Sequence, residues 1–470
     1  MINLYPKKSL LGKNWKIKDI DEKECLMISQ RHEVSINISK LLFLRNIKDW
    51  DVETFFHPNF FENLPDPFIL KDMEKSIDRT IDAIKNHHKI GIIADYDVDG
   101  STSAAVLSKF LSLIGVSNFI KVPERLVEGY GPNKRIMDEF SSKNINLIFT
   151  LDCGTTSFDV FEKNNNKKID IIVIDHHISE QKLPNVYSMI NPNRFDENNI
   201  FKDLAAVGIT FIFIMGLRKK LREINFFKDK IKEPNILNLL DLVALGTICD
   251  VVNLKNYNRI FVKKGLDIIK KRSNIGISKI IDNSNINYTP NSSDIGYIIG
   301  PQLNAASRLG DSTLSSKILT SNNLEEIDKI SKKLFLLNEK RKLIENNIFE
   351  QALLQINKQL DSKYILVHGF GWHQGVLGIV ASRLVEKFQK PSFVISNDKK
   401  VGVGSARSVH GIDLGNIILN AKNHKLLISG GGHKMAAGIK INNFYLNEFK
   451  NFLNNVFNKF NESSFKNDDY

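Results

Sequence analysis

Short apolar runs alternate with helical periodicities along the first two thirds of this chain. Residues 73–88 and 101–114 carry apolar side chains at helical spacing, which predicts two amphipathic helices. Apolar runs at 89–94, 146–151 and 169–174 are each followed by an ionisable residue and are short enough to be buried strands. Buried strands that alternate with helices predict an α/β fold with a parallel sheet covered by helices on both faces.

The rest of the pattern divides the chain into further parts. Residues 1–72 are interrupted by Pro and Asn and predict an N-terminal extension packed on a catalytic domain at 73–320. A charged, leucine-containing stretch predicts a long connecting helix within 321–360. A smaller α/β domain is expected at 361–455, followed by a polar tail at 456–470. A chain of 470 residues is long enough for several domains.

Composition places the chain among globular proteins, with 42% hydrophobic and 25% charged residues. It has no apolar run of the ~20 residues that span a bilayer, and its N-terminus lacks the apolar core of a signal peptide. We therefore expect a cytoplasmic protein. Cys25, Cys153 and Cys249 are far apart, which argues against a disulfide framework or a zinc knuckle. The net charge of +12 suits a polyanionic partner, although a Lys-, Asn- and Ile-rich composition from an AT-rich genome would produce it without a functional cause.

Ionisable residues stand at the ends of the predicted strands. Asp95 follows the first, Asp152 the second, and Asp175-His176-His177 the third. One such Asp usually caps a helix or a turn. The carboxyl ends of parallel strands lie at one edge of the sheet, where ligands bind, so three such ends indicate a functional site.

The first of these ends continues as Ala94-Asp95-Tyr96-Asp97-Val98-Asp99-Gly100. Three carboxylates on alternate residues repel one another unless a cation neutralises them. Carboxylates with imidazole favour Mn²⁺ or Mg²⁺, and a pair of such ions is a known device for phosphoryl transfer. The run also resembles the start of a calcium-binding EF-hand loop, but the twelfth residue from Asp95 is Val106 and not Glu. Asp250 follows an apolar helical run, and this pattern alone predicts a helix-end carboxylate with no special role.

Together these motifs resemble the DHH phosphoesterase superfamily and, within it, the RecJ family of bacterial single-strand-specific 5′→3′ DNA exonucleases. Further segments carry the resemblance in family order, from about residue 45 to 440: His57-Pro58, Leu64-Pro65-Asp66-Pro67-Phe68, Leu151-Asp152-Cys153-Gly154, Leu240 through Val252, Leu303-Asn304-Ala305-Ala306-Ser307-Arg308, Trp372-His373-Gln374-Gly375-Val376-Leu377-Gly378-Ile379 and Gly431-Gly432-His433-Lys434-Met435-Ala436-Ala437-Gly438. Chance agreement over so many separated motifs is not a reasonable alternative.

The resemblance implies a DHH domain with a parallel sheet, joined by a long helix to a smaller α/β DHHA1 domain. It implies that two Mn²⁺ or Mg²⁺ ions are bound by six residues: Asp95, Asp97, Asp99, Asp152, His176 and Asp250. Asp97, Asp152, His176 and His177 would carry the catalysis. Arg308 would reach the substrate backbone. The terminal 5′ phosphate would be held by Ser405 and Arg407 with Arg125, near the glycine-rich Gly431-Gly432-His433 motif.

The function implied is release of 5′-mononucleotides from single-stranded DNA in repair and recombination. We expect a monomer, and a single-strand-binding protein or a helicase is a candidate further partner. The same superfamily offers an alternative, a phosphodiesterase for short oligonucleotides or cyclic dinucleotides, and less readily a pyrophosphatase. The RecJ-type N-terminal segment and the long connecting helix favour the exonuclease. A non-catalytic DNA-binding scaffold is a third interpretation, and the complete ligand set argues against it.

The chain departs from the family pattern in three places. Ser307 stands where the family has Gly, and a left-handed backbone there would cost about 1 kcal/mol or more and shift Arg308. Ala406 replaces a second Gly between Ser405 and Arg407. Relatives also continue into an OB-fold domain, whereas this sequence stops just after the DHHA1 unit. We expect intact chemistry with a weaker grip on DNA, lower processivity and stronger salt dependence.

Overall fold

Five parallel strands form a sheet within residues Ile47–Asn338, in the order β2-β1-β3-β4-β5. They are β1 (Ile90–Ala94), β2 (Asn118–Lys121), β3 (Leu147–Leu151), β4 (Asp170–Ile174) and β5 (Ser188–Ile190). The register partners Ile92, Phe149 and Ile172 pack into one core, and Ile93 and Val173 pack into another on the opposite face. β1 and β3 are buried at every position. The predicted parallel sheet with two covered faces is confirmed.

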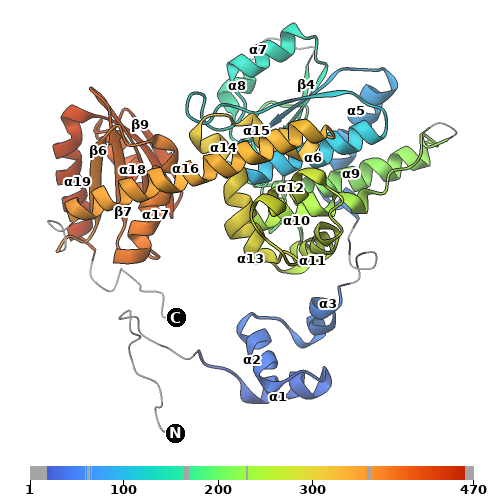
Figure 1. Cartoon of the computed structure of the whole chain (residues 1–470), viewed down its shortest axis with the longest axis horizontal. Helices are drawn as coiled ribbons and strands as arrows, with labels where there is room; N and C mark the ends of the chain where they lie inside the picture. Colours follow the sequence, from blue (N-terminus) through green and yellow to red (C-terminus); the bar gives the residue numbers. More distant parts are fainter. Residues whose placement is uncertain are drawn as a thin grey trace. The chain divides into compact units, whose positions relative to one another are not determined.

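The computed structural model describes residues 18–58, 60, 64, 66–162, 169–228, 231–356 and 361–460. The helices of the sheet-containing unit are α3 (Val52–Phe56), α5 (Met73–Lys85), α6 (Val98–Leu113), α7 (Lys134–Ser142), α8 (Phe158–Glu162), α9 (Ala206–Glu223), α10 (Leu240–Cys249), α11 (Asn256–Lys270), α12 (Ile275–Asn283), α13 (Ser292–Asp294), α14 (Gly300–Leu309) and α15 (Thr313–Thr320). Short helical turns lie at η1 (Asp49–Asp51), η2 (Pro67–Ile69), η3 (Ile236–Leu239) and η4 (Ile295–Ile299). α7 and α8 cover one face of the sheet, and α5, α6 and α9 cover the other (Figure 1).

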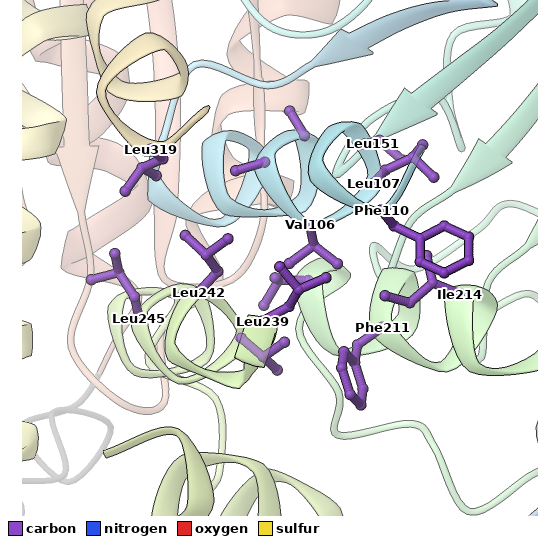
Figure 2. Packing of buried hydrophobic residues seen from close by; sticks show 14 of the residues in the cluster. Val106, Leu107, Phe110, Leu151, Phe211, Ile214, Leu239, Leu242, Leu245 and Leu319 are labelled. Atoms are coloured by element: carbon purple, nitrogen blue, oxygen red, sulfur yellow. The ribbon is translucent and has the colours of Figure 1, made fainter. Parts of the chain in front are cut away.

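The main core lies between α6 and the helices beneath it. Val106 and Phe110 of α6 are fully buried. Figure 2 shows them close to Leu242 of α10 and Phe211 of α9. α6 is therefore enclosed by the sheet on one side and by helices on the other. Its two ends lie outside this core.

One predicted helix boundary is wrong. The apolar spacing placed the start of the helix at Ser101, but α6 begins at Val98. The Asp97 side chain accepts a hydrogen bond from the Gly100 backbone N–H at 3.0 Å and caps the helix one turn earlier. The correction puts Asp99 on the first turn of α6 and not in a loop.

The C-terminal sheet belongs to the second unit, which comprises residues 339–470 with 1–46. Its order is β6-β7-β8-β10-β9, with β6 and β7 parallel and the remaining pairs antiparallel. The elements are β6 (Ile365–Phe370), η5 (Gln374–Val376), α17 (Leu377–Phe388), β7 (Ser392–Asn397), β8 (Val401–Arg407), α18 (Leu414–Asn423), β9 (Ser429–Gly432), β10 (Ala436–Asn442), η6 (Asn443–Tyr445) and α19 (Leu446–Asn458). The predicted second α/β unit is confirmed.

The predicted connecting helix is also present, as α16 (Leu324–Ile356), which has 33 residues and contains neither Gly nor Pro. Near the N-terminus, α1 (Glu22–Arg31) and α2 (Ile36–Leu44) form a pair of short helices. Among the described helices, none combines the length and the apolar character that a membrane span requires. The domain limits stay predictions, and residues 461–470 of the predicted tail lie outside the described residues.

Candidate metal centre

The carboxyl-terminal edge of the parallel sheet gathers seven ionisable side chains within residues 47–338: Asp95, Asp97, Asp99, Asp152, His176, His177 and Asp250. Asp95 follows β1, Asp152 follows β3, and the two histidines follow β4. α6 supplies Asp97 and Asp99 from its N-terminal end, and Asp250 ends α10. The site therefore joins three strand ends to two helix ends.

Candidate ligand atoms form three overlapping groups, in each of which they all lie within 4.8 Å of one another. One contains Asp95, Asp97 and Asp152. A second contains Asp99, His176 and Asp250, and a third Asp152, His176 and His177. His176 Nε2 lies 3.3 Å from Asp152 Oδ1, 3.6 Å from Asp250 Oδ2 and 3.9 Å from Asp99 Oδ2. The imidazole thus lies among carboxylates that come from three different elements.

These carboxylates are buried close together, and this burial raises their pKa values. Burial and the neighbouring Asp97 charge raise the pKa of Asp95 well above its usual range. Burial, with Asp97 and Asp99, does the same to the pKa of Asp152. Burial and Asp97 raise the pKa of Asp250 to about 7. The site without a cation holds more negative charge than the low-dielectric environment accommodates.

The donor atoms fit divalent cations. Four of them are buried and have no hydrogen-bond partner among the residues that the structure describes: Asp95 Oδ1, Asp152 Oδ1, His176 Nε2 and Asp250 Oδ2. Buried polar atoms are nearly always hydrogen-bonded, so four in one place require an explanation. Burial, together with His177, lowers the pKa of His176 to about 4, which leaves the ring neutral and able to donate a lone pair. Carboxylate oxygens with a neutral imidazole are the ligands that Mn²⁺ and Mg²⁺ accept.

The two adjacent histidines have opposite environments. Burial acts to lower the pKa of His177, but its hydrogen bond to Asp175 outweighs this and raises the pKa to about 9. His177 Nδ1 donates to Asp175 Oδ1 at 2.8 Å. Asp175 Oδ2 accepts a further bond from the Thr155 backbone N–H. Asp175 is fully buried and serves to hold the His177 ring as a cation.

Tyr130 supports the same region from the segment between β2 and α7. Its hydroxyl donates to the Asp152 backbone carbonyl at 2.9 Å and lies 3.2 Å from His177 Nδ1. Its ring meets the His177 ring edge to face, with centroids 5.6 Å apart. Asp152 has a left-handed backbone at φ 59°, which is unusual for a residue with a side chain. The hydrogen bond from Tyr130 therefore helps to hold Asp152 in this strained backbone conformation.

The Asp99 carboxylate also contacts the start of α9. Its Oδ2 accepts a hydrogen bond from the Ala206 N–H at 2.7 Å, and Oδ1 accepts one from Val207 at 2.9 Å. Ala205, at the N-cap of α9, has no side chain that could do this. Asp99 therefore caps α9 while it contributes to the acidic centre.

Two glycines let the backbone approach the acidic residues closely. A Cβ at Gly100 would lie 2.4 Å from the Asp95 carbonyl oxygen. A Cβ at Gly246 in α10 would lie 2.2 Å from Thr102 Oγ1 and 3.2 Å from Asp99 Oδ1. α10 can therefore pass α6 at this distance only without a side chain at 246.

The predicted phosphate-binding arginines of this unit lie near Tyr96. The Arg125 guanidinium stacks over the Tyr96 ring, 4.7 Å from its centroid. Burial and Asp95 raise the pKa of Tyr96 to about 12, and the charges of Arg125 and Arg308 oppose that rise. Ser307, the residue before Arg308, has a helical backbone within α14. The strain expected at this departure from the family glycine does not arise.

The predicted residues of the C-terminal unit gather around β10. Arg407 of β8 and Gly432 of β9 pair with successive residues of β10, on its opposite sides. Arg407 Nη1 donates to Ser405 Oγ at 3.1 Å. Gly431 precedes Gly432, and the His433 N–H donates to the Ala436 carbonyl that ends this turn. Ala406 is a buried residue in the extended strand β8, so the second departure from the family pattern also causes no backbone strain.

Sequence reasoning missed the supporting roles of Tyr130 and Asp175. Asp175 belongs to the motif at the end of β4, but the motif predicted a function only for its neighbours His176 and His177. Tyr130 lies between Gly129 and Gly131, which both have φ 80°. A Gly-Tyr-Gly segment is a signal for a tight turn that presents an aromatic side chain, and it could have found this residue.

Comparison with known proteins agrees with this arrangement. Residues 89–247 match the DHH family, N-terminal domain, and residues 361–462 match the DHHA1 domain. The chain is 33% identical over 405 residues to the single-stranded-DNA-specific exonuclease RecJ of Haemophilus influenzae, which covers 84% of this chain and 70% of that protein. It is 35% identical over 385 residues to the Escherichia coli protein of the same name, covering 79% of this chain and 67% of that protein.

Solved structures give the same result. An exonuclease RecJ bound to manganese matches with a TM-score of 0.73 at 28% identity, over 85% of this chain and 96% of that one. RecJ from Thermus thermophilus in complex with Mn²⁺ matches with a TM-score of 0.81 at 26% identity, over 95% of this chain and 63% of that one. Among the curated relatives the covered share is 55% in the Bacillus subtilis protein and 54% in the Thermus thermophilus protein, so this chain spans only part of their length.

Proposed function

The chain belongs to the RecJ family of DHH/DHHA1 phosphoesterases, and from this premise we propose that it is a single-strand-specific 5′→3′ DNA exonuclease. It hydrolyses phosphodiester bonds and releases 5′-mononucleotides. The observation that carries the proposal is the cluster of buried, unpartnered donor atoms at the edge of the parallel sheet. Relatives whose names state this activity are about one third identical to the chain.

Two divalent cations, Mn²⁺ or Mg²⁺, would be held by six residues: Asp95, Asp97, Asp99, Asp152, His176 and Asp250. When bound, such cations activate water and neutralise charge on the phosphoryl oxygens. The protein supplies the carboxylates already assembled: α6, α10 and the strand ends hold them together against their mutual repulsion. Because the fold already holds these carboxylates close together, the ligands need little rearrangement when cations bind.

His177 acts on the substrate. Asp175 and Tyr130 hold its Nδ1 side, so the Nε2 side is the part of the ring that the scissile phosphate can reach. As a cation at neutral pH it stabilises the negative charge that develops on a non-bridging phosphoryl oxygen. The protonated His177 ring can also act as a general acid and donate a proton to the leaving 3′ oxygen.

Recognition of the DNA is divided between the two units. Arg308 contacts the substrate backbone, and Arg125, held over Tyr96, contacts phosphate. Ser405, Arg407 and the Gly431-Gly432-His433 turn bind the terminal 5′ phosphate, because guanidinium and closely approachable backbone N–H groups are both phosphate ligands. A pocket for a terminal phosphate makes degradation start at the 5′ end.

The test is digestion of long single-stranded DNA labelled at either end, with Mn²⁺ present, by the wild type, Asp152→Ala and Asp78→Ala. Asp78 lies exposed on α5 and serves as the matched control. We expect the wild type to release mononucleotides from the 5′ end and to leave duplex DNA intact. Asp152→Ala should lose this activity, and Asp78→Ala should retain it in full. Turnover of dinucleotides without digestion of long strands would replace the proposal with a phosphodiesterase for short substrates.

A further inference from the structure

A cavity of about 510 Å³ lies at the far ends of the two helices that carry the acidic centre. Its lining includes Lys109 of α6 and Asp241 of α10. Asp99 precedes Lys109 by ten residues on α6, which corresponds to roughly 15 Å along the helix axis. Asp241 precedes Asp250 by nine residues along α10, which corresponds to roughly 14 Å. The cavity is thus separate from the metal centre, and the proposed exonuclease mechanism does not use it.

The cavity is lined by one ionisable side chain of each sign. Asp241 is only 2% exposed, and Lys109 is mostly buried. Among the described residues neither takes part in an ion pair, although the Asp241 charge acts on Lys109 through space. Burial lowers the pKa of Lys109 and raises the pKa of Asp241 to about 6, so each charged form lacks full compensation. Asp241 Oδ1 accepts a bond from the Leu242 N–H, and no side chain among the described residues donates to its Oδ2.

The two charges restrict the chemistry of a ligand. An anion alone would be repelled by the Asp241 carboxylate, and a cation alone by the Lys109 ammonium. A neutral molecule with a hydrogen-bond acceptor beside a donor satisfies both groups. Leu113 and Leu239 add apolar surface to the same cavity, which suits the faces of a flat ring. The Asn238 amide adds a further donor and acceptor.

We propose that this cavity binds a nucleobase, with guanine as the best fit. Guanine presents the O6 acceptor, which lysine recognises in DNA, and N–H donors on the same edge, which a carboxylate accepts. The volume lies within the range of small-molecule sites, ~300–1,000 Å³. The choice of a nucleobase among neutral amide-like molecules rests on the proposed function, whose products each carry one.

Guanosine is the probe, because it has no phosphate for the arginines to bind. Isothermal titration of guanosine into the metal-free protein, with the whole 470-residue chain present, is expected to show one site. Lys109→Met and Asp241→Asn should each weaken that binding at least tenfold, whereas Lys264→Met, a change on the exposed face of α11, should leave it unchanged. Leu113→Trp places a large ring at the cavity edge from a half-exposed position and should abolish binding with the fold intact.

Each other outcome overturns the proposal. Guanosine that does not bind at millimolar concentration, or that binds equally to Lys109→Met, Asp241→Asn and Leu113→Trp, excludes a base in this cavity. Thermal unfolding and Mn²⁺ titration of each variant confirm that the fold and the metal centre are retained. The nuclease assay is a separate experiment, so failure of guanosine binding leaves the proposed exonuclease standing, and failure of the nuclease assay does not remove a measured site.

Discussion

Tyr130 reaches two parts of the metal centre with one hydroxyl group. Its bond to the Asp152 carbonyl and its position beside His177 Nδ1 orient both residues. In Tyr130→Phe we expect kcat to fall roughly fivefold, because one such hydrogen bond contributes about 1 kcal/mol. The KM for DNA and the Tm should change little. Steady-state kinetics over pH 6–9 measure this, and the upper limb of the pH profile should shift because His177 loses a neighbour.

Tyr288→Phe provides the matched control for that substitution. The Tyr288 hydroxyl also donates a single bond, at 2.8 Å to Asp294, but from outside the acidic centre. An equal loss of kcat in both variants would mean that Tyr130 contributes only to general stability.

The metal-free protein should become less stable as the pH rises from about 6.5 to 8. In this window the raised pKa values of Asp95, Asp99, Asp152 and Asp250 mean that the folded state binds more protons than the unfolded state. Stability then falls with rising pH. His177 acts in the same direction: its pKa of about 9 exceeds the unfolded value, so its contribution is complete below pH 6.5 and is lost towards pH 9.

Saturating Mn²⁺ should remove most of that slope, because cations replace protons among the carboxylates. The opposing effect of His176, with its pKa near 4, is confined to pH values below about 6.5. Calorimetric Tm values in chelator and in Mn²⁺ at pH 6.5, 7.25 and 8 give the comparison. A Tm that rises with pH in chelator would contradict the assignment of raised carboxylate pKa values.

At the scale of elements, Asp99 makes the stability of α9 depend on a residue of the acidic centre. Asp99→Ala leaves the Ala206 and Val207 N–H groups without an acceptor, whereas Asp99→Asn keeps one oxygen to accept a bond. Both changes remove the same charge. We expect the Asn variant to be more stable than the Ala variant by about 1 kcal/mol in the metal-free protein. Urea unfolding of the two variants measures the difference, and equal midpoints would show that the cap contributes nothing.

The sequence predicted the long elements well and the short ones poorly. Apolar runs identified β1, β3 and β4 because these strands are buried on both faces. β2 has no fully buried residue, and β5 has only three residues, so neither forms an apolar run. The start of α6 was misplaced because a cap, Asp97, and not an apolar residue defines it.

The candidate site divides in the same way. Asp95, Asp152 and His176 could be placed together from the pattern alone, since parallel strands end at one edge. Asp250 could not, because the pattern of α10 does not reveal where its C-terminal end packs. Only the family resemblance suggested it, and the structure puts it 3.6 Å from His176.

At the scale of the whole molecule, the net charge of +12 predicts strong salt dependence of DNA binding. We expect the slope of log K against log salt to become about 0.7 less negative when Arg308→Ala removes one phosphate contact. Anisotropy of a labelled single strand, measured in the inactive Asp152→Ala background, gives this slope. Lys264→Met is the control, and an unchanged slope in the Arg308 variant would remove this residue from the DNA contacts.

The close passage of α10 over α6 at Gly246 has a consequence for genetics. A single added methyl group there would press on Thr102 and displace Asp99 without removing any chemical group from the centre. A screen for loss of function should therefore recover substitutions at Gly246 as often as substitutions of the acidic residues. The added methyl group would also lie 2.8 Å from Val207 Cγ1, so second-site suppressors should combine smaller side chains at Thr102 and Val207 to restore the space. Such compensating pairs would identify the contact between α10 and α6 by genetics alone.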